Sequence, residues 1–292
     1  LIILLSLFLL RKKYNFVTEE KLLKVRKIHQ KSMIKIGGAC LLPVLLIVFY
    51  GIDFQLMLVV YSSILVFLIG FIDDLNESIS ALARLIILFT IIFLFISLSG
   101  LPIREIGLGH IDIYLYKFSL IAIIFTTLCL LVTINGFNLI DGQHGLMLGT
   151  NFLIVISFYF LLPSDAVLAK NVFISLLIVT SILFVANYFT GKIKAGDCGS
   201  YFLGFVTGSL VIYSYNLYTI DPFFVACLFF YPVFELVFSY FRRIFTGKNP
   251  FKPDDKHLHS LLFSYLKNSH VLKSVDIEDV NRLTSFIILL YL

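Results

Sequence analysis

Charged residues are scarce in this sequence. Only 14% of its 292 residues are charged, whereas 59% are hydrophobic and the mean hydropathy is +0.98. Soluble domains carry about 25% charged residues. The composition therefore excludes an ordinary soluble protein and favours a chain that lies mostly in a membrane.

Cysteines are also few, and they lack the spacing of a disulfide framework or a metal site. Cys40, Cys129, Cys198 and Cys227 are widely separated. Three of them lie in or against apolar runs, where a free cysteine behaves as a small hydrophobic residue. We therefore expect no disulfide.

Long apolar runs are abundant. About 20 apolar residues are needed to cross roughly 30 Å of hydrocarbon, and such runs recur between short polar breaks. They predict an all-α polytopic membrane protein with about ten transmembrane helices that form one domain over residues 1–292. The expected spans are 1–10, 38–53, 55–72, 83–99, 117–134, 146–163, 170–188, 201–218, 220–241 and 284–292. Because the first and last runs are short and no initiating Met is present, we expect a fragment of a longer protein.

The distribution of basic residues predicts the orientation of these spans. One set of alternate loops carries 20 of the 23 Lys and Arg residues, and by the positive-inside rule this side is cytoplasmic. The predicted cytoplasmic loops are 11–37, 73–84, 135–145, 189–200 and 242–283. Membrane topology accounts for much of this basic bias, so the net charge of +5 does not indicate a nucleic-acid partner.

The polar clusters of the chain all fall on this predicted cytoplasmic side. In "FIDDL", Asp73 and Asp74 directly follow a span. Adjacent residues on a helix point about 100° apart, so one carboxylate could face a metal while the other faces a substrate proton. The alternative interpretation is a carboxylate pair that simply ends a helix in water.

The segment "NGFNLIDGQHG" places Asn135, Asn138, Asp141 and His144 at every third position. A regular helix would spread these residues over different faces, but the intervening glycines allow the backbone to leave the helix. Amide and carboxylate oxygens suit a hard cation such as Mg²⁺, which shares its ligands with waters and phosphates. A glycine-rich turn capped by Asn and Asp is the alternative.

The segment "AGDCGS" contributes Asp197 and Ser200 at the start of a span. Glycine-rich backbone at a helix N-terminus can present N–H groups to an anion, although an ordinary helix cap has the same pattern.

The last polar segment is rich in cations, namely Arg242, Arg243, Lys256, His257 and His259. The two histidines could serve one ligand together only where the chain is extended, because in a helix they would diverge by about 200°. Cations beside an acidic, metal-binding cluster suit a nucleotide diphosphate. A positive-inside loop with two incidental histidines is the alternative.

Taken together, these loops resemble the polyprenyl-phosphate N-acetylaminosugar-1-phosphate transferase superfamily, of the bacterial undecaprenyl-phosphate GlcNAc-1-phosphate transferase type in glycosyltransferase family 4. The motifs that carry the resemblance are "FIDDL", "NGFNLIDGQHGL", "AGDCGSYFLG" and "RRIFTGKNPFKPDDKHLHSLL". They occur in one order, and the resemblance extends over essentially the whole chain.

The resemblance implies transfer of a sugar 1-phosphate from a UDP-N-acetylaminosugar to undecaprenyl phosphate, in one step or two, with release of UMP. The site would lie on the cytoplasmic face of the bacterial inner membrane, with Mg²⁺ or Mn²⁺ as cofactor, in a monomer or a homodimer. The product would begin O-antigen or another cell-envelope polysaccharide, such as that of teichoic-acid synthesis. UDP-GlcNAc is the default donor, and the GalNAc, FucNAc and QuiNAc donors are equally compatible.

The resemblance also implies roles for individual residues. The catalytic residues would be Asp73, Asp74 and Asp141, and the metal ligands Asn138, Asp197 and Asp74. The substrate-binding residues would be Asn135, His144, Ser200, Arg242, Arg243, Lys256, His257 and His259.

Two departures from the family pattern stand out. His144 occupies a position where many relatives have Asp or Asn, and Ser260 replaces a further histidine, which argues against the peptidoglycan branch. The competing hypothesis is a membrane transporter with acidic and basic gating loops. Glu235, close to Pro232 in the ninth span, favours it because intramembrane acids are functional by default.

Overall fold

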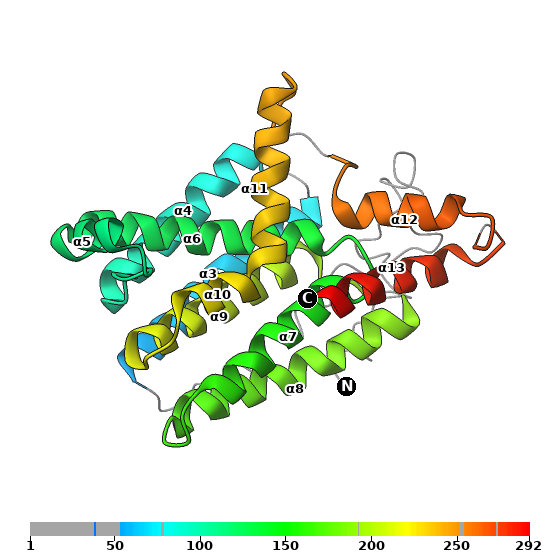
Figure 1. Ribbon diagram of the computed structural model, residues 1–292. Helices are drawn as coiled ribbons and strands as arrows, with labels where there is room; N and C mark the ends of the chain where they lie inside the picture. Colours follow the sequence, from blue (N-terminus) through cyan, green and yellow to red (C-terminus); the bar gives the residue numbers. More distant parts are fainter. Residues whose placement is uncertain (1–37, 39–52, 77–78, 192, 251–253, 273) are drawn as a thin grey trace.

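The computed structural model describes residue 38 and residues 53–76, 79–191, 193–250, 254–272 and 274–292. Over these residues the fold is all-α, as predicted (Figure 1). The helices are α3 (Phe54–Asn76), α4 (Ala81–Ser99), α5 (Gly109–Lys117), α6 (Ser119–Ile140), α7 (Leu146–Leu161), α8 (Val167–Thr190), α9 (Gly196–Leu217), α10 (Pro222–Leu228), α11 (Phe230–Phe245), α12 (Leu258–Asn268) and α13 (Ile277–Tyr291).

Four of these helices, α3, α4, α6 and α8, are long and apolar enough to cross a membrane. The pair α10 and α11 would make a fifth span, although it is bent by 72°. These helices support a polytopic membrane protein, but the described residues do not support about ten spans. The expected runs 1–10 and 38–53 lie outside them, apart from Gly38 and Asp53.

The remaining expected spans differ for separate physical reasons. Helix α7 has only 16 residues, which is shorter than the 17–25 that cross a bilayer. Residues 284–292 continue a helix that begins at Ile277 with a polar first turn containing Glu278 and Asp279. Helix α9 is long enough to cross a bilayer, with 22 residues, but it is less apolar than a membrane span, because Gly, Ser, Thr and Tyr occur along it.

Helix α9 is the centre of the bundle. Most of its side chains are buried, and it packs against α3, α6 and α7. A helix buried on every side needs small residues where its neighbours approach closely. At Gly204, an added Cβ would lie 2.9 Å from the Cα of Ile134 on α6, and at Gly70 of α3 it would lie 2.6 Å from the backbone of Asp197.

Two of the predicted loops are partly helical. Helix α3 continues to Asn76, so Asp73 and Asp74 lie in its last turns. Helix α6 continues to Ile140, so Asn135 and Asn138 lie on a helix, although we expected the glycines to break it. Gly136 has another role, because a Cβ there would lie 2.5 Å from the carbonyl oxygen of Pro232 on α11.

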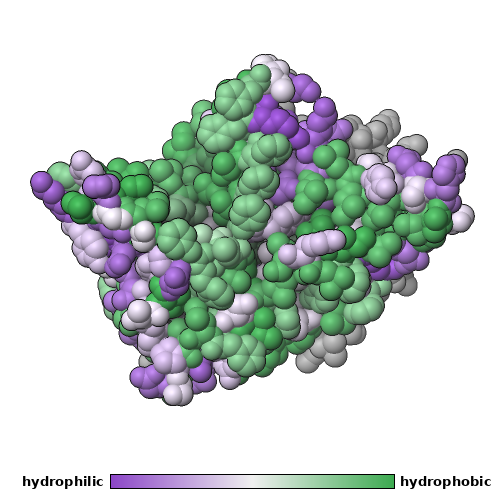
Figure 2. All heavy atoms as spheres, in the orientation of Figure 1, coloured by the Kyte–Doolittle hydropathy of each residue, from purple (hydrophilic) through white to green (hydrophobic). Residues whose placement is uncertain are grey.

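The two ends of the molecule differ. Helix α5 lies at one end, while α12 and α13 pack together at the other, and α11 rises steeply from the bundle beside α6 (Figure 1). Hydrophobic residues cover the middle of the visible face, and hydrophilic residues gather toward its extremities (Figure 2). This distribution suits a protein whose middle contacts lipid.

Candidate active site

The acidic part of the site forms where α3 and α6 end and α9 begins. The carboxylate oxygens of Asp74 accept hydrogen bonds from the backbone N–H groups of Asp197 and Cys198, at 3.1 and 2.9 Å. These N–H groups belong to the first turn of α9 and have no partner within their own helix. Asp74 therefore caps α9 from a distant helix, and both oxygens that we assigned to metal binding and catalysis have backbone partners.

Asp73 has a different partner. Its Oδ2 pairs with the guanidinium of Arg84 in the first turn of α4. The same guanidinium lies 3.5 Å from the carboxylate of Asp197 and 5.7 Å from the ring centre of Tyr201. One cation thus holds two acids from different helices close together.

Arg84 was not among our predicted site residues. The sequence does contain a signal, because it is the single charged residue within the apolar segment 81–99. An ionisable residue in such a segment costs free energy unless a partner or a function retains it.

Asn138 connects α6 to α9. Its amide nitrogen donates to Asp197 Oδ1 at 2.8 Å and to Ser200 Oγ at 3.0 Å. Ser200 in turn donates to the backbone carbonyl of Asp197 at 3.3 Å. Three residues that we predicted from two separate motifs therefore form one cluster, in which the side chain of Asp197 remains 34% exposed.

Asp141, directly after the last residue of α6, completes the acidic cluster. It is buried, and its carboxylate accepts from the backbone N–H of Gly196 at 3.2 Å. Burial, which is the largest cause, and the nearby charges of Asp197 and Asp74 outweigh the lowering effects of Lys194 and the Gly196 N–H, and together they raise the pKa of Asp141 to about 7. Asp141 can therefore exchange a proton near neutral pH.

The oxygen donors of this cluster suit Mg²⁺. Within the described residues, no group of three His, Cys, Asp or Glu side chains could hold a metal ion. Mg²⁺ does not need such a cage, because it commonly takes one or two carboxylates and completes its shell with waters and substrate phosphates. The exposed carboxylate of Asp197, close to Asp73 through Arg84, fits that mode.

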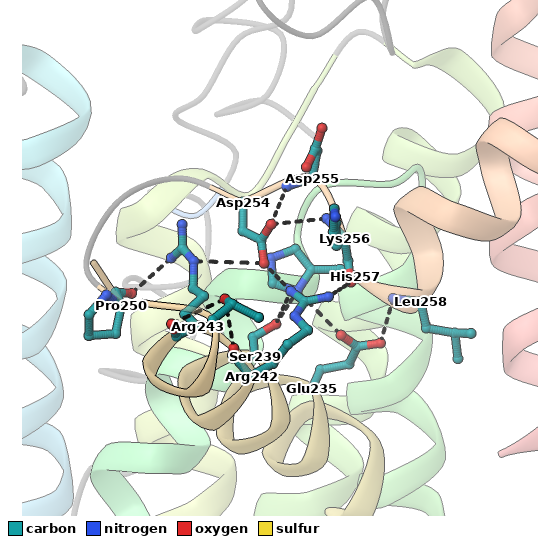
Figure 3. Close-up of polar contacts among 11 residues, drawn as sticks. Glu235, Ser239, Arg242, Arg243, Pro250, Asp254, Asp255, Lys256, His257 and Leu258 are labelled. Atoms are coloured by element: carbon teal, nitrogen blue, oxygen red, sulfur yellow. Dashed lines mark hydrogen bonds and ion pairs between the residues drawn. The ribbon is translucent and has the colours of Figure 1, made fainter. Parts of the chain in front are cut away.

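The cationic part of the site joins the end of α11 to the start of α12 (Figure 3). Arg242 pairs with Asp254 and donates to the backbone carbonyl of Lys256 at 2.6 Å. Arg243 lies 3.8 Å from the same carboxylate and donates to the carbonyl of Pro250 at 2.9 Å. These contacts fold the segment after α11 back onto the helix.

The surroundings of Asp254 favour its ionised form. Desolvation alone would raise its pKa, but the Lys256 N–H group and the charges of Arg242 and Arg243 outweigh it, so the pKa lies below its ordinary value. A persistent negative charge between two arginines keeps this part of the chain folded.

The two histidines lie together at the start of α12. His257 has extended backbone (φ −80°, ψ 152°), and its ring stacks on that of His259 with centres 5.4 Å apart. This is the condition under which we expected the pair to act together. His257 Nδ1 lies 3.0 Å from Ser239 Oγ and 3.3 Å from Glu235 Oε2 (Figure 3).

Glu235, the acid that favoured a transporter, is bound to this segment. It is buried, and its Oε1 accepts from the backbone N–H of Leu258 at 2.8 Å. With His257 at its other oxygen, Glu235 anchors the N-terminus of α12 to α11, which is a structural explanation for a carboxylate in this helix.

The acidic and cationic parts of the site are contiguous. Gln143 Nε2 lies 3.5 Å from the backbone carbonyl of His259. A Cβ added at Gly142 would lie 3.5 Å from Nε2 of the same histidine. The segment that carries Asp141 therefore touches the segment that carries the histidines.

Asn135 and His144, which we predicted to bind substrate, have partners within the protein instead. The amide of Asn135 donates to the carbonyl of Leu131 in its own helix, at 2.8 Å. His144 is fully buried and pairs with Glu278 of α13. We expected the backbone to leave the helix within this segment, but α6 continues through Asn135 and Asn138 and ends at Ile140, so the side chains of Asn135 and His144 point toward different partners.

The fold and the site define a polytopic membrane protein with an acidic cluster at helix ends beside a cationic segment. The chain belongs to glycosyl transferase family 4, whose family model matches residues 56–215. That match includes the acidic cluster and ends before α11.

Curated relatives cover more of the chain. It is 29% identical to an undecaprenyl-phosphate alpha-N-acetylglucosaminyl 1-phosphate transferase of Thermotoga maritima, over 80% of this chain and 69% of the relative. It is 24% identical to a protein of the same name from Yersinia pestis, over 89% and 75% of the two chains. A probable undecaprenyl-phosphate N-acetylglucosaminyl 1-phosphate transferase of Bacillus subtilis is 26% identical, over 82% and 68%.

Proposed function

We propose that this protein transfers an N-acetylaminosugar 1-phosphate from a UDP-sugar to undecaprenyl phosphate on the cytoplasmic face of the inner membrane. The names of the curated relatives support the lipid acceptor and the sugar-phosphate transfer. The observation that carries the proposal is the contact between the acidic cluster around Asp197 and the histidine-bearing segment, through Gln143 and His259.

The net bond change is balanced within the two substrates. A bond forms between an oxygen of the lipid phosphate and the phosphorus attached to the sugar. The bond from that phosphorus to the bridging oxygen breaks, and its electron pair leaves with UMP. One phosphoanhydride replaces another, so the protein must mainly position two anions and reduce their repulsion.

The residues divide this work by charge. Asp197 would hold Mg²⁺, with Asn138 fixing its carboxylate, and the metal when bound neutralises phosphate charge. The Arg242 and His257 segment would receive the nucleotide diphosphate. Asp73 would orient or deprotonate the lipid phosphate, and Asp141, with its raised pKa, would exchange a proton nearby.

The membrane explains why these groups lie at helix ends. Each buried CH₂ of an anchored chain contributes about 0.8 kcal/mol, so a polyprenyl tail stays in the bilayer and its phosphate stays at the interface. Asp73 lies in the last turns of an apolar helix, which is the depth that such a phosphate reaches.

The test is incubation of membranes that contain the protein with radiolabelled UDP-sugars and undecaprenyl phosphate. We expect a lipid-extractable product and Mg²⁺-dependent release of UMP with at least one of the GlcNAc, GalNAc, FucNAc and QuiNAc donors. The variants Asp73→Asn, Asp74→Asn and Asp197→Asn should abolish it, whereas Asp165→Asn, in the exposed α7–α8 connection, should not. Absence of product with every donor, or near wild-type turnover in all three site variants, would contradict the proposal.

A further inference from the structure

The segment between α6 and α7 is held by a helix that lies outside the family match. Asn281 of α13 accepts the backbone N–H of His144 through Oδ1, at 2.8 Å. One turn earlier on the same face of α13, Glu278 pairs with the imidazole Nε2 of His144. Both contacts join residues more than 130 positions apart in the sequence.

A second set of contacts fixes the same segment from α8. Asn187 Oδ1 accepts the N–H of Gly145 at 2.5 Å, and its amide nitrogen donates to the carbonyl of Ile193 at 2.5 Å. Gly145 adopts φ +75°, a left-handed conformation that glycine tolerates best. Two consecutive backbone N–H groups therefore have distant side-chain acceptors.

All of these groups are buried. His144 and Asn281 have no exposed surface, and Glu278 is 6% exposed. The packing is also close, because a Cβ added at Gly191 would lie 3.1 Å from the His144 ring and 3.5 Å from Glu278 Oε2. A buried imidazole paired with a carboxylate in this way has one orientation available, so the backbone that carries it is fixed as well.

That backbone carries two groups of the site. Asp141 lies three residues before His144 and faces Gly196 at the start of α9. Gln143, the residue immediately before His144, faces His259. A displacement of His144 would therefore move the acid on one side of the site and the contact with α12 on the other.

We propose that Glu278 and Asn281 are positioning residues for the reaction: through His144 they hold residues 141–145 so that Asp141 and Gln143 face the substrates. Resting on the proposed function, this assignment gives α13 a role in the site. It also gives His144 a structural role as the buried partner in that contact, in place of the substrate-binding role that the resemblance implied. A displacement of about 1 Å in a site can cost roughly 100-fold in rate.

The test compares two substitutions at one position. Glu278→Gln keeps the size of the side chain and its capacity to hydrogen-bond with the imidazole, whereas Glu278→Leu keeps only the approximate size. We expect the Gln variant to retain at least about a third of the wild-type turnover. The Leu variant should lose at least about tenfold in kcat, with a smaller change in the KM for the UDP-sugar, because positioning acts on the reacting geometry.

The matched control is Thr284→Val on the same helix. Thr284 is fully buried and its hydroxyl bonds to the carbonyl of Val280 within α13. The Thr284→Val variant should keep kcat within about twofold of the wild-type value. Should Glu278→Leu fail to fold, Asn281→Ala provides the same comparison, since it removes the acceptor of the His144 N–H.

Hydrogen exchange of the purified protein separates this inference from the proposed function. In Glu278→Leu or Asn281→Ala, amides of residues 141–145 should exchange at least about tenfold faster, while those of α4 should not change. If these variants exchange faster but the wild-type protein is inactive toward every donor, the proposed function is refuted and the structural contact stands. Unchanged exchange, or a kcat equal to that of Thr284→Val, would overturn the positioning role.

Discussion

The amide nitrogen of Asn138 lies 2.8 Å from the carboxylate of Asp197, across the contact between α6 and α9. The same nitrogen lies 3.0 Å from the hydroxyl of Ser200. Because one side chain satisfies two acceptors, it fixes the orientation of the exposed carboxylate that we assign to Mg²⁺. Its removal should affect chemistry more than folding.

The first prediction concerns this amide. Asn138→Ala leaves Asp197 and Ser200 without their shared donor, and an unsatisfied partly buried acceptor costs about 1–3 kcal/mol. We expect UMP release to fall by at least about tenfold. The control is Thr133→Val on the same helix, since the Thr133 hydroxyl donates to the backbone carbonyl of Cys129 within α6. Equal activity of the two variants would contradict the role of Asn138.

The second prediction concerns Arg84. Arg84→Met leaves the carboxylates of Asp73 and Asp197 without the cation between them, and like charges then repel. Turnover should fall at least about 100-fold, while Arg84→Lys, which keeps the charge but not the planar fork, should fall between that and wild type. Measurement of initial rates in membranes at equal protein levels tests this order.

The control for Arg84 is Arg104→Met. The guanidinium of Arg104 donates to the backbone carbonyl of Tyr116 and to the hydroxyl of Ser119. Its loss should change turnover less than about twofold. If Arg84→Met matched Arg104→Met, the bridging cation would have no part in the reaction.

The third prediction concerns the metal. Removal of divalent ions with EDTA should abolish transfer, and Mg²⁺ should restore it, with Mn²⁺ as a substitute. Asp197→Glu keeps a carboxylate but displaces it, so we expect it to need at least about tenfold more Mg²⁺ for half-maximal rate. Full turnover in EDTA would show that the acidic cluster works without a metal.

Some of this site was predictable from the sequence. Apolar runs and polar breaks indicated an all-α membrane protein, and the motifs around Asp73, Asn138 and Asp197 proved to be neighbours in space. Placing a charged group inside lipid costs free energy, so the positions of charged residues in a hydrophobic membrane protein are strongly restricted. This restriction is what makes polar clusters informative here.

Other features depended on tertiary contacts that no local pattern contains. Asp74 caps α9 from another helix, and Gly136 permits α6 to approach α11 without breaking the helix. His144 pairs with Glu278, which lies 134 residues later and was not among the predicted site residues. Spacing predicts which residues share a helix face, but not which distant helix covers that face.

The fourth prediction concerns pH and Asp141. Its pKa is about 7 in the folded protein, against about 3.9 for an unfolded aspartate. Between these values the folded state binds more protons than the unfolded state, so stability falls as pH rises from about 4 to about 7. Asp141→Asn stays neutral throughout and should remove this decline. Thermal denaturation of the detergent-solubilised protein in EDTA, between pH 5 and pH 8, measures the slope. Asp165→Asn, at an exposed position, should keep the wild-type slope, and a slope unchanged in Asp141→Asn would show that Asp141 is already ionised in the folded protein at pH 5.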